Sequence, residues 1–183
     1  MSNVGLLVLG WVGALTVVFL IACWVGVLLR PNWKRLRHRR KQMTARRVFE
    51  KLATIPHPGQ KLVYLRQIDP LVFEELVLEA FERRGHEVFR SASYSGDGGV
   101  DGRVSVRGRP YLVQCKRYSK HISKQHVLAF AAILDSRQVH GLFCHTGRTG
   151  EFSRDFHKNH PYLTIISGEK LVNLLTLPPA SIR

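Results

Sequence analysis

The stretch that decides the fold is SGDGGVDGRVSVRGRPYLVQCKRY, residues 95–118. Its first part is rich in glycine, and apolar and polar side chains alternate in the two runs that follow, at 100–107 and 111–118. Alternation with a period of two is typical of a strand that has one buried face. Gly108 and Arg109 lie between the runs, so we expect a β-hairpin with these two residues in its turn.

The expected turn sets which residues face each other across the hairpin. Val104 would lie opposite Val113 on an apolar face, whereas Asp101 would lie opposite Lys116 on the polar face that also carries Gln114. A slip of one residue would turn charged side chains into the core, which disfavours that alternative register. The hairpin is therefore expected to bring a carboxylate, an amide and an amine together beside the glycines, which let a ligand approach closely.

The segments around the hairpin predict an α/β fold. After residue 118, helical periodicity alternates with short apolar runs, an order typical of strands joined by crossover helices. We therefore expect a sandwich whose mixed sheet is antiparallel at first and parallel after the first crossover. Asp69, followed by Pro70, is expected to cap the first helix. The expected helices are 70–84, 122–137, 151–160 and 167–175, and the expected strands are 86–93, 100–107, 111–118, 140–145 and 162–166.

Residues 4–29 form a run of 26 positions without a charged side chain. As a helix this run would be about 39 Å long, which exceeds the roughly 30 Å hydrocarbon core of a bilayer. We interpret it as a transmembrane helix. A lipoprotein signal ending at Cys23 is the alternative, but no charged side chain precedes the apolar run, and the run continues past that cysteine.

A basic segment follows the apolar run. Residues 30–51 contain 10 lysines and arginines and one glutamate, which accounts for +9 of the formal net charge of +15. Such a cluster beside a span predicts that this side is cytoplasmic and lies against the anionic lipids of the inner membrane. We therefore interpret residues 30–64 as a basic juxtamembrane segment and linker, and residues 65–178 as a compact cytoplasmic domain. The remaining charge is only weak support for a polyanionic partner.

Two kinds of site are disfavoured by the sequence. The glycine loop lacks the lysine and hydroxyl residue of a P-loop and precedes a strand rather than a helix, which disfavours nucleotide binding. The three cysteines form no CxxC pair, and the histidines between residues 140 and 160 do not have the spacing of a zinc site. These histidines, His145 among them, are therefore expected to be scattered over the surface.

Three motifs together resemble the catalytic domain of Mrr-type restriction endonucleases, a branch of the PD-(D/E)xK nuclease superfamily. They are Phe73-Glu74 in the first helix, SGDGGVDG at 95–102 and VQCKR at 113–117, and the resemblance extends over about residues 65–178. It implies a restriction-endonuclease-like α/β/α sandwich with a central mixed sheet. It also implies that the substrate is DNA.

The resemblance implies a role for each of five positions. Asp101 and Glu74 would bind a Mg²⁺ ion together with the main-chain carbonyl of Cys115, because hard cations take oxygen ligands. Lys116 would be the catalytic lysine, and Gln114 stands where the superfamily more often has glutamate. An amide brings no charge, so the metal would be held more weakly than by three carboxylates.

The implied function is that of a membrane-anchored, Mg²⁺-dependent DNA endonuclease. The alternative is a nuclease fold that binds or tethers DNA at the membrane without turnover, and a membrane-surface scaffold without a nucleic-acid role is a third hypothesis. A homodimer would allow both strands to be cut. Glu75 and Asp97 lie close to the motif residues in sequence, but neither matches the motif, so neither is expected to take part.

Overall fold

The computed structural model describes residue 24 and residues 33–91 and 99–176. Contacts within the chain divide it into two units, residues 1–37 and residues 38–183, and the second unit contains the whole sheet. Among the described residues, no helix is both long enough and apolar enough to cross a bilayer. The expected membrane span at 4–29 lies outside the described residues except for Trp24.

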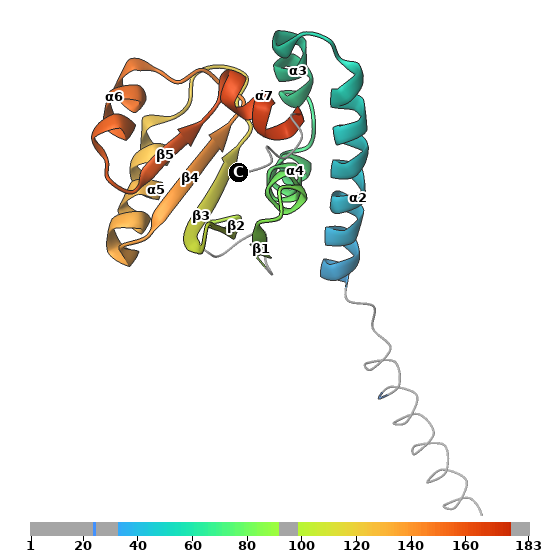
Figure 1. The fold of residues 1–183 in the computed structure, drawn as a ribbon, viewed down its shortest axis with the longest axis horizontal. Helices are drawn as coiled ribbons and strands as arrows, with labels where there is room; N and C mark the ends of the chain where they lie inside the picture. Colours follow the sequence, from blue (N-terminus) through green and yellow to red (C-terminus); the bar gives the residue numbers. More distant parts are fainter. Residues whose placement is uncertain (1–23, 25–32, 92–98, 177–183) are drawn as a thin grey trace, which may run out of the picture. The chain divides into compact units, whose positions relative to one another are not determined.

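A five-stranded mixed sheet forms the middle of the second unit (Figure 1). The strands lie side by side in chain order. The first three pair antiparallel, and the third, fourth and fifth pair parallel, which confirms the predicted change of direction. The strands are β1 (Glu87–Arg90), β2 (Gly102–Val106), β3 (Arg109–Lys116), β4 (His140–His145) and β5 (Leu163–Ile166).

Helices lie on both sides of the sheet, which gives the three layers of an α/β/α sandwich (Figure 1). The α/β fold with a mixed sheet that the sequence predicts is thereby confirmed. One side carries α2 (Trp33–Thr54), α3 (Pro58–Leu65), α4 (Pro70–Arg83) and α7 (Gly168–Thr176), and the other carries α5 (Lys124–Arg137) and α6 (Glu151–Asn159).

Alternation along β3 divides the core between the two sides of the sheet. Val113 and Cys115 pack in the buried cluster on the side of α4. Leu112 packs in a second cluster with Phe130 of α5 and Phe143 of β4. Each fully buried side chain of this size stabilises the fold by about 1.5–3 kcal/mol. The period-two pattern of β3 therefore decides which face each of its side chains takes.

Helix α4 begins where the sequence predicts. Asp69 Oδ1 accepts hydrogen bonds from the N–H groups of Leu71 at 2.9 Å and Val72 at 3.2 Å, and Pro70 occupies the first turn. Gly85 follows the end of the helix with a φ of 78°, a left-handed conformation that suits glycine. These end signals set the limits of α4, and thereby the position of its acidic side chains.

Helix α2 differs from the expected linker. The sequence-based prediction is a juxtamembrane segment and linker at residues 30–64, whereas α2 has 22 residues and the compact unit begins at His38. Ala45, Val48 and Leu52 of α2 are buried in the core. The helix therefore belongs to the body of the domain.

Ion pairs to α4 explain why so basic a helix can pack against the core. Lys41 Nζ lies 2.8 Å from Asp69 Oδ2, and Arg46 Nε lies 3.4 Å from Glu79 Oε1. The Lys41 side chain is 23% exposed and lies toward the core, whereas that of Arg46 is 63% exposed and makes its ion pair at the surface. The inner side of α2 thus mixes apolar side chains with the paired Lys41. This mixture masks the amphipathic pattern by which a packed helix is usually predicted.

The hairpin has the expected faces but a different turn. Arg107 and Gly108 occupy the turn, with φ angles of 52° and 75°. A turn with two left-handed residues matches the twist of the paired strands, and glycine is favoured in its second position. The pairing of β2 with β3 is displaced by two residues from the predicted register. Every side chain keeps its face, but the prediction that Asp101 lies opposite Lys116 is wrong.

Candidate active site

Asp101 lies immediately before β2 and is held by the backbone of β3. Its N–H donates to the carbonyl of Val113 at 2.9 Å, and its Oδ2 accepts from the N–H of Cys115 at 2.6 Å. A backbone N–H that donates to a carboxylate makes a strong, charge-assisted hydrogen bond. The carboxylate is therefore anchored to β3, one residue before Lys116.

Gln114 is buried and is oriented by the end of the glycine loop. Its Nε2 donates to the carbonyl of Gly99 at 2.5 Å, and its Oε1 is buried without a hydrogen-bond partner among the described residues. Gly99 has a φ of 89°, and a Cβ atom at this position would collide with Gln114 Nε2. The site therefore requires glycine at position 99, because the backbone must come this close to the amide.

Glu74, Asp101 and Lys116 share one electrostatic environment. Burial and the nearby Asp101 raise the pKa of Glu74 to about 8, and Lys116 opposes the rise. Burial also raises the pKa of Asp101 to about 6. The hydrogen bond from the N–H of Cys115 and the positive charge of Lys116 oppose this rise. The structure thus brings the two acids and the amine together, as the sequence predicts, whereas the role of each stays a prediction.

The oxygen atoms of this site suit a hard divalent cation. A cation beside Glu74 and Asp101 would offset the desolvation and the repulsion that raise their pKa values. The free Oε1 of Gln114 offers a neutral oxygen ligand. In the part of the chain that the structure describes, no group of three or more His, Cys, Asp or Glu side chains could hold a metal. A cation here would therefore depend on two carboxylates, the amide and main-chain oxygen.

Cys115 contributes its backbone to the site rather than its sulfur. The side chain is buried on the side of α4, and Cys144 of β4 is its partner in the sheet register. Burial and the neighbouring Cys144 raise the pKa of the Cys115 thiol well above its usual value. A neutral, buried thiol is a poor ligand for a hard cation. The predicted role of the Cys115 carbonyl involves no sulfur and stays a prediction.

Glu75, the neighbour of Glu74, is an acid of the core. Its Oε2 lies 3.1 Å from Arg90 Nε, and its Oε1 lies 3.1 Å from His38 Nε2. Glu75 is buried, so these partners stabilise a charge that would otherwise be costly inside the protein. Its position agrees with the prediction that it takes no part in the site, and Asp97 lies outside the described residues.

His145 is a buried residue that the sequence-based prediction misses. It ends β4 in register with Lys116, and its exposed fraction is 0%, so the expected surface position is wrong. Its Nε2 lies 3.1 Å from Thr149 Oγ1, which lies 3.0 Å from Ser167 Oγ. Burial lowers the pKa of His145 to about 4. The signal in the sequence was a polar residue at the carboxyl end of a buried parallel strand, where α/β proteins often gather functional side chains.

A family model for the Mrr catalytic domain, described as restriction endonuclease, matches residues 65–175. The chain belongs to this restriction endonuclease family. We call the matched residues 65–175 the Mrr domain. A relative of it is the type IV methyl-directed restriction enzyme EcoKMrr of Escherichia coli (strain K12). The two are 29% identical over 119 residues, which cover 61% of this chain and 39% of that enzyme. The chain therefore spans about two fifths of the length of that relative.

Among solved structures, the restriction endonuclease FokI is similar to the chain with a TM-score of 0.46 and 17% sequence identity. The similarity covers 78% of this chain and 32% of the FokI chain. This likeness is too distant to carry an argument about function. The chain is therefore assigned to the family by the match of its sequence to the family model over residues 65–175.

Proposed function

We propose that the Mrr domain is a Mg²⁺-dependent endonuclease that hydrolyses phosphodiester bonds of DNA. The observation that carries the proposal is the meeting of Glu74, Asp101 and Lys116, with an unpartnered, buried oxygen on Gln114. Hydrolysis of a phosphodiester builds negative charge on the phosphate oxygens, which an amine and a divalent cation can stabilise. Lys116 provides the amine, and the oxygen atoms of Asp101, Glu74 and Gln114 provide ligands for the cation.

Each side chain then has its own task. Asp101 and Glu74 would hold the cation, and a bound cation would favour the ionised form of both carboxyl groups. When bound, the cation supplies positive charge to the oxygens of the phosphate. Lys116 donates a hydrogen bond to the attacking water or to a phosphate oxygen. Gln114 uses Nε2 to bond Gly99, so its Oε1 is left for the cation.

The test is cleavage of supercoiled plasmid by the full chain, with Mg²⁺ or with EDTA. We expect cutting with Mg²⁺ only, and we expect Asp101→Asn and Lys116→Ala each to slow it by about 10² or more. Arg109→Gln removes an exposed charge at the other end of β3 and should cut like the parent. Cutting in EDTA, or parental rates in the two site variants, would refute the proposal.

A nuclease fold that binds DNA without turnover is the second candidate function. Gln114 favours it, because a site with two carboxylates binds a divalent cation less strongly than a site with three. Both candidates predict binding to DNA that weakens as salt rises. The second candidate is correct if the parent binds DNA in the plasmid assay but yields no nicked or linear product at any Mg²⁺ concentration.

We further propose that residues 4–29 anchor the protein in the inner membrane with the Mrr domain in the cytoplasm. The uncharged run of 26 residues and the basic residues after it support this proposal. Arg39, Arg40 and Arg47 of α2 are exposed around the exposed Met43, a combination that suits anionic headgroups. Release of the protein from membranes by alkaline carbonate would contradict the anchor, and protection from protease on the cytoplasmic side would contradict the orientation.

We propose a homodimer as the form that cuts both strands. One site of this kind hydrolyses one strand at a time, so a double-strand break needs two sites on opposite strands. The rate of linear product should then rise more steeply than linearly with protein concentration. A linear dependence for this product would contradict the dimer.

A further inference from the structure

The loops that follow β3 and β4 are joined into one surface, which we call the loop platform (residues 117–123 and 146–150). The N–H of Arg148 donates to the carbonyl of Lys120 at 2.9 Å, and the N–H of Ile122 donates to the carbonyl of Arg148 at 3.1 Å. His121 and Arg148 thereby form an isolated parallel bridge. These hydrogen bonds restrain the backbones of the two loops, whereas surface loops without such bonds are more mobile.

Hydrogen bonds of Thr146 tie the two loops of the platform to each other and to Arg66. Thr146 Oγ1 accepts from the N–H of Tyr118 at 3.0 Å and donates to its carbonyl at 2.8 Å. Arg66 Nε donates to the carbonyl of Thr146 at 2.9 Å. A Cβ atom on Gly147 would lie 2.5 Å from the carbonyl oxygen of Lys120 and 2.7 Å from Tyr118 Cβ. Glycine at position 147 is therefore what allows the two loops to lie this close together.

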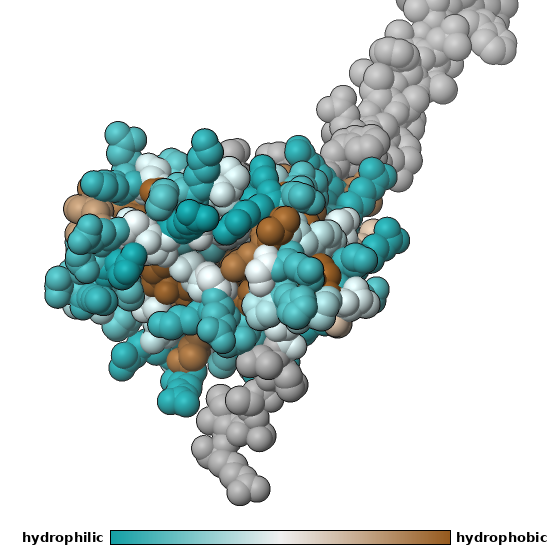
Figure 2. Space-filling model, turned by 90° about the horizontal axis from the view of Figure 1, so that it is seen from above, coloured by the Kyte–Doolittle hydropathy of each residue, from teal (hydrophilic) through white to brown (hydrophobic). Residues whose placement is uncertain are grey.

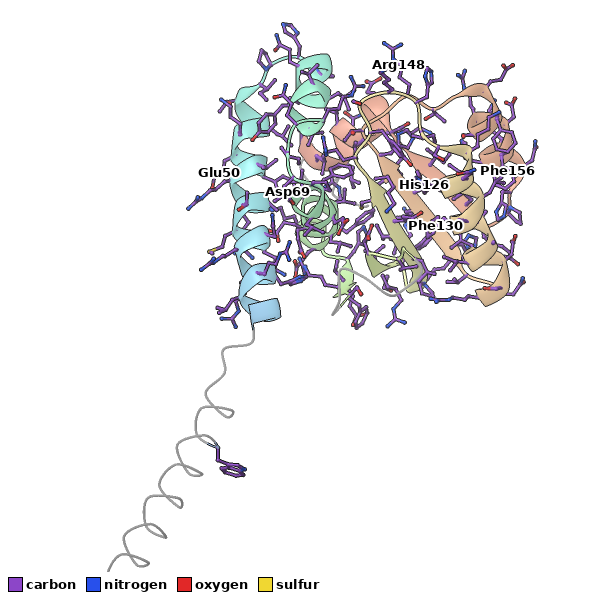
Figure 3. The ribbon with its side chains drawn as sticks, turned by 180° about the vertical axis from the view of Figure 1, so that it is seen from behind. Glu50, Asp69, His126, Phe130, Arg148 and Phe156 are labelled. Carbon is purple, nitrogen blue, oxygen red and sulfur yellow. The ribbon has the colours of Figure 1, made fainter. Side chains whose placement is uncertain are left out.

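The loop platform presents positive charge without acidic partners. Arg117, Lys120, His121 and Arg148 are exposed, and Figure 3 shows Arg148 at the end of the sheet. Within the described residues, no Asp or Glu forms an ion pair with Arg117, Lys120 or Arg148. Residues 102–134 contain no acidic residue, and the exposed Glu151 directly follows the second loop and lines a pocket with His121. The surface therefore suits a partner that carries negative charge at several points.

The loop platform lies at the same end of the sheet as the candidate active site. Lys116 is the last residue of β3 and His145 the last of β4, and the two are partners in the register. The loop platform begins one residue after each of them. Figure 2 views the compact unit from above Figure 1, and hydrophilic side chains cover most of this face. A long anionic molecule bound to the loop platform would therefore pass close to Lys116.

We propose that the loop platform binds backbone phosphates of duplex DNA and positions the scissile phosphodiester at Lys116. This inference rests on the proposed function and adds the substrate-binding surface to it. Duplex DNA carries one negative charge per about 1.7 Å of its axis, so a compact basic surface can contact several phosphates at once. Contacts to phosphates fix the position of the duplex but do not distinguish one base sequence from another.

A nucleic acid fits the loop platform better than a lipid surface does. Of the exposed large apolar side chains among the described residues, Phe152 lies two residues after the loop platform, and Lys124 Nζ lies 4.9 Å from the centroid of its ring. The others lie in other parts of the chain. Helices and loops that bind membranes usually insert such side chains beside their basic residues. The loop platform itself carries charge and no exposed large apolar side chain, and a lysine lies over the ring of the neighbouring Phe152, which suits contact with a phosphate backbone.

The test measures DNA binding without cleavage. The full chain in a neutral detergent, with EDTA, is titrated against a fluorescent duplex at several salt concentrations, and anisotropy gives the dissociation constant. Lys120→Gln with Arg148→Gln should lower the salt slope by about 2, because each phosphate contact contributes about 0.9. The same relation gives about a 30-fold loss of affinity at about 0.15 M salt. Both side chains are exposed, and the platform bonds use their backbone atoms, so the fold should be kept.

The matched control is Arg109→Gln with Arg137→Gln. It removes the same charge from exposed positions at the start of β3 and at the end of α5, away from the loop platform. Its slope and affinity should equal those of the parent. Gly147→Ala changes no charge but separates the loops, so it should also weaken binding.

The outcomes separate this inference from the proposed function. Equal losses in the platform variant and in the control, or parental binding by the platform variant, would overturn the loop platform while leaving hydrolysis to be judged by plasmid cleavage. Platform-dependent binding by a parent that never cuts would support the loop platform and refute the nuclease. In a parallel arm, a water-soluble short-chain anionic phospholipid replaces the duplex, and a platform variant that lost binding of this lipid but kept DNA binding would overturn the inference.

Discussion

His145 should make the stability of the domain depend on pH, in a direction that follows from its burial. Tyr118 and Phe143 pack against its ring, and burial lowers its pKa to about 4. In the unfolded chain a histidine has its ordinary pKa of about 6.5. The unfolded state therefore takes up the proton first. The contribution of His145 to the free energy of unfolding is complete above pH 6.5 and is lost as the pH falls toward 4.

The size of the effect follows from the same two pKa values. A fall from about 6.5 to about 4 corresponds to about 3 kcal/mol, lost at up to about 1.4 kcal/mol per pH unit. Asp101 and Glu74 titrate in the opposite sense, because burial raises their pKa values. The parent must therefore be compared with His145→Gln, whose amide can still reach the hydroxyl of Thr149 and which does not titrate.

Urea unfolding of the parent and of His145→Gln, repeated between pH 7.5 and pH 4, gives the free energy of unfolding of each. The parent should be the more stable at neutral pH, and its advantage should shrink by about 3 kcal/mol toward pH 4. An advantage that does not change with pH would refute the reasoning. An NMR titration in which His145 gains its proton near pH 6.5 would refute it as well.

Three further substitutions test other parts of the account. Gly99→Ala should lower both the rate of cleavage and the thermal stability, because alanine disfavours a φ of 89° and its Cβ would displace Gln114. A parental rate of cleavage would show that the position of the Gln114 amide does not depend on glycine at position 99. Arg90→Met should lower the free energy of unfolding in urea by about 3 kcal/mol, since it removes a partner from the buried Glu75. A change near zero would mean that the interactions left to Glu75, such as the one with His38, suffice. Leu52→Ala should lower the free energy of unfolding by about 2–5 kcal/mol because Leu52 is buried. An effect as small as that of a substitution at an exposed position would show that α2 is not part of the core.

Local signals were enough to predict α4 and the faces of the hairpin. Asp69 and Pro70 mark the start of the helix, and the period-two pattern assigns each β3 side chain to its side of the sheet. The register was harder, because both Arg107–Gly108 and Gly108–Arg109 form a two-residue turn that contains glycine. Only the backbone twist favours the first, and a displacement of two residues leaves the pattern of faces unchanged. The sequence therefore predicts which side chains share a face, but not which lie opposite each other.

Long-range partners account for the parts of the fold that the sequence did not predict. The basic side chains of α2 were assigned to a juxtamembrane segment, because acids that pair with them come more than twenty residues later in the chain. Arg46 pairs with Glu79 in this way. His145 looked like one of several surface histidines until the packing of β4 enclosed it. The candidate site was predictable as a set of residues, since Glu74, Asp101, Gln114 and Lys116 belong to motifs. The unpartnered Oε1 of Gln114 depends on the close approach of Gly99, which no motif describes.

The measurement that tests the central claim most directly is the single-turnover rate of plasmid cleavage by the full chain as Mg²⁺ is varied. The account predicts a rate that rises with Mg²⁺ to a plateau. Glu74→Gln and Asp101→Asn should require much more Mg²⁺, whereas Lys116→Ala should lower the plateau by about 10² or more at an unchanged Mg²⁺ midpoint. A plateau and midpoint that none of the three substitutions changes, in variants that melt like the parent, would place the chemistry somewhere else in the protein.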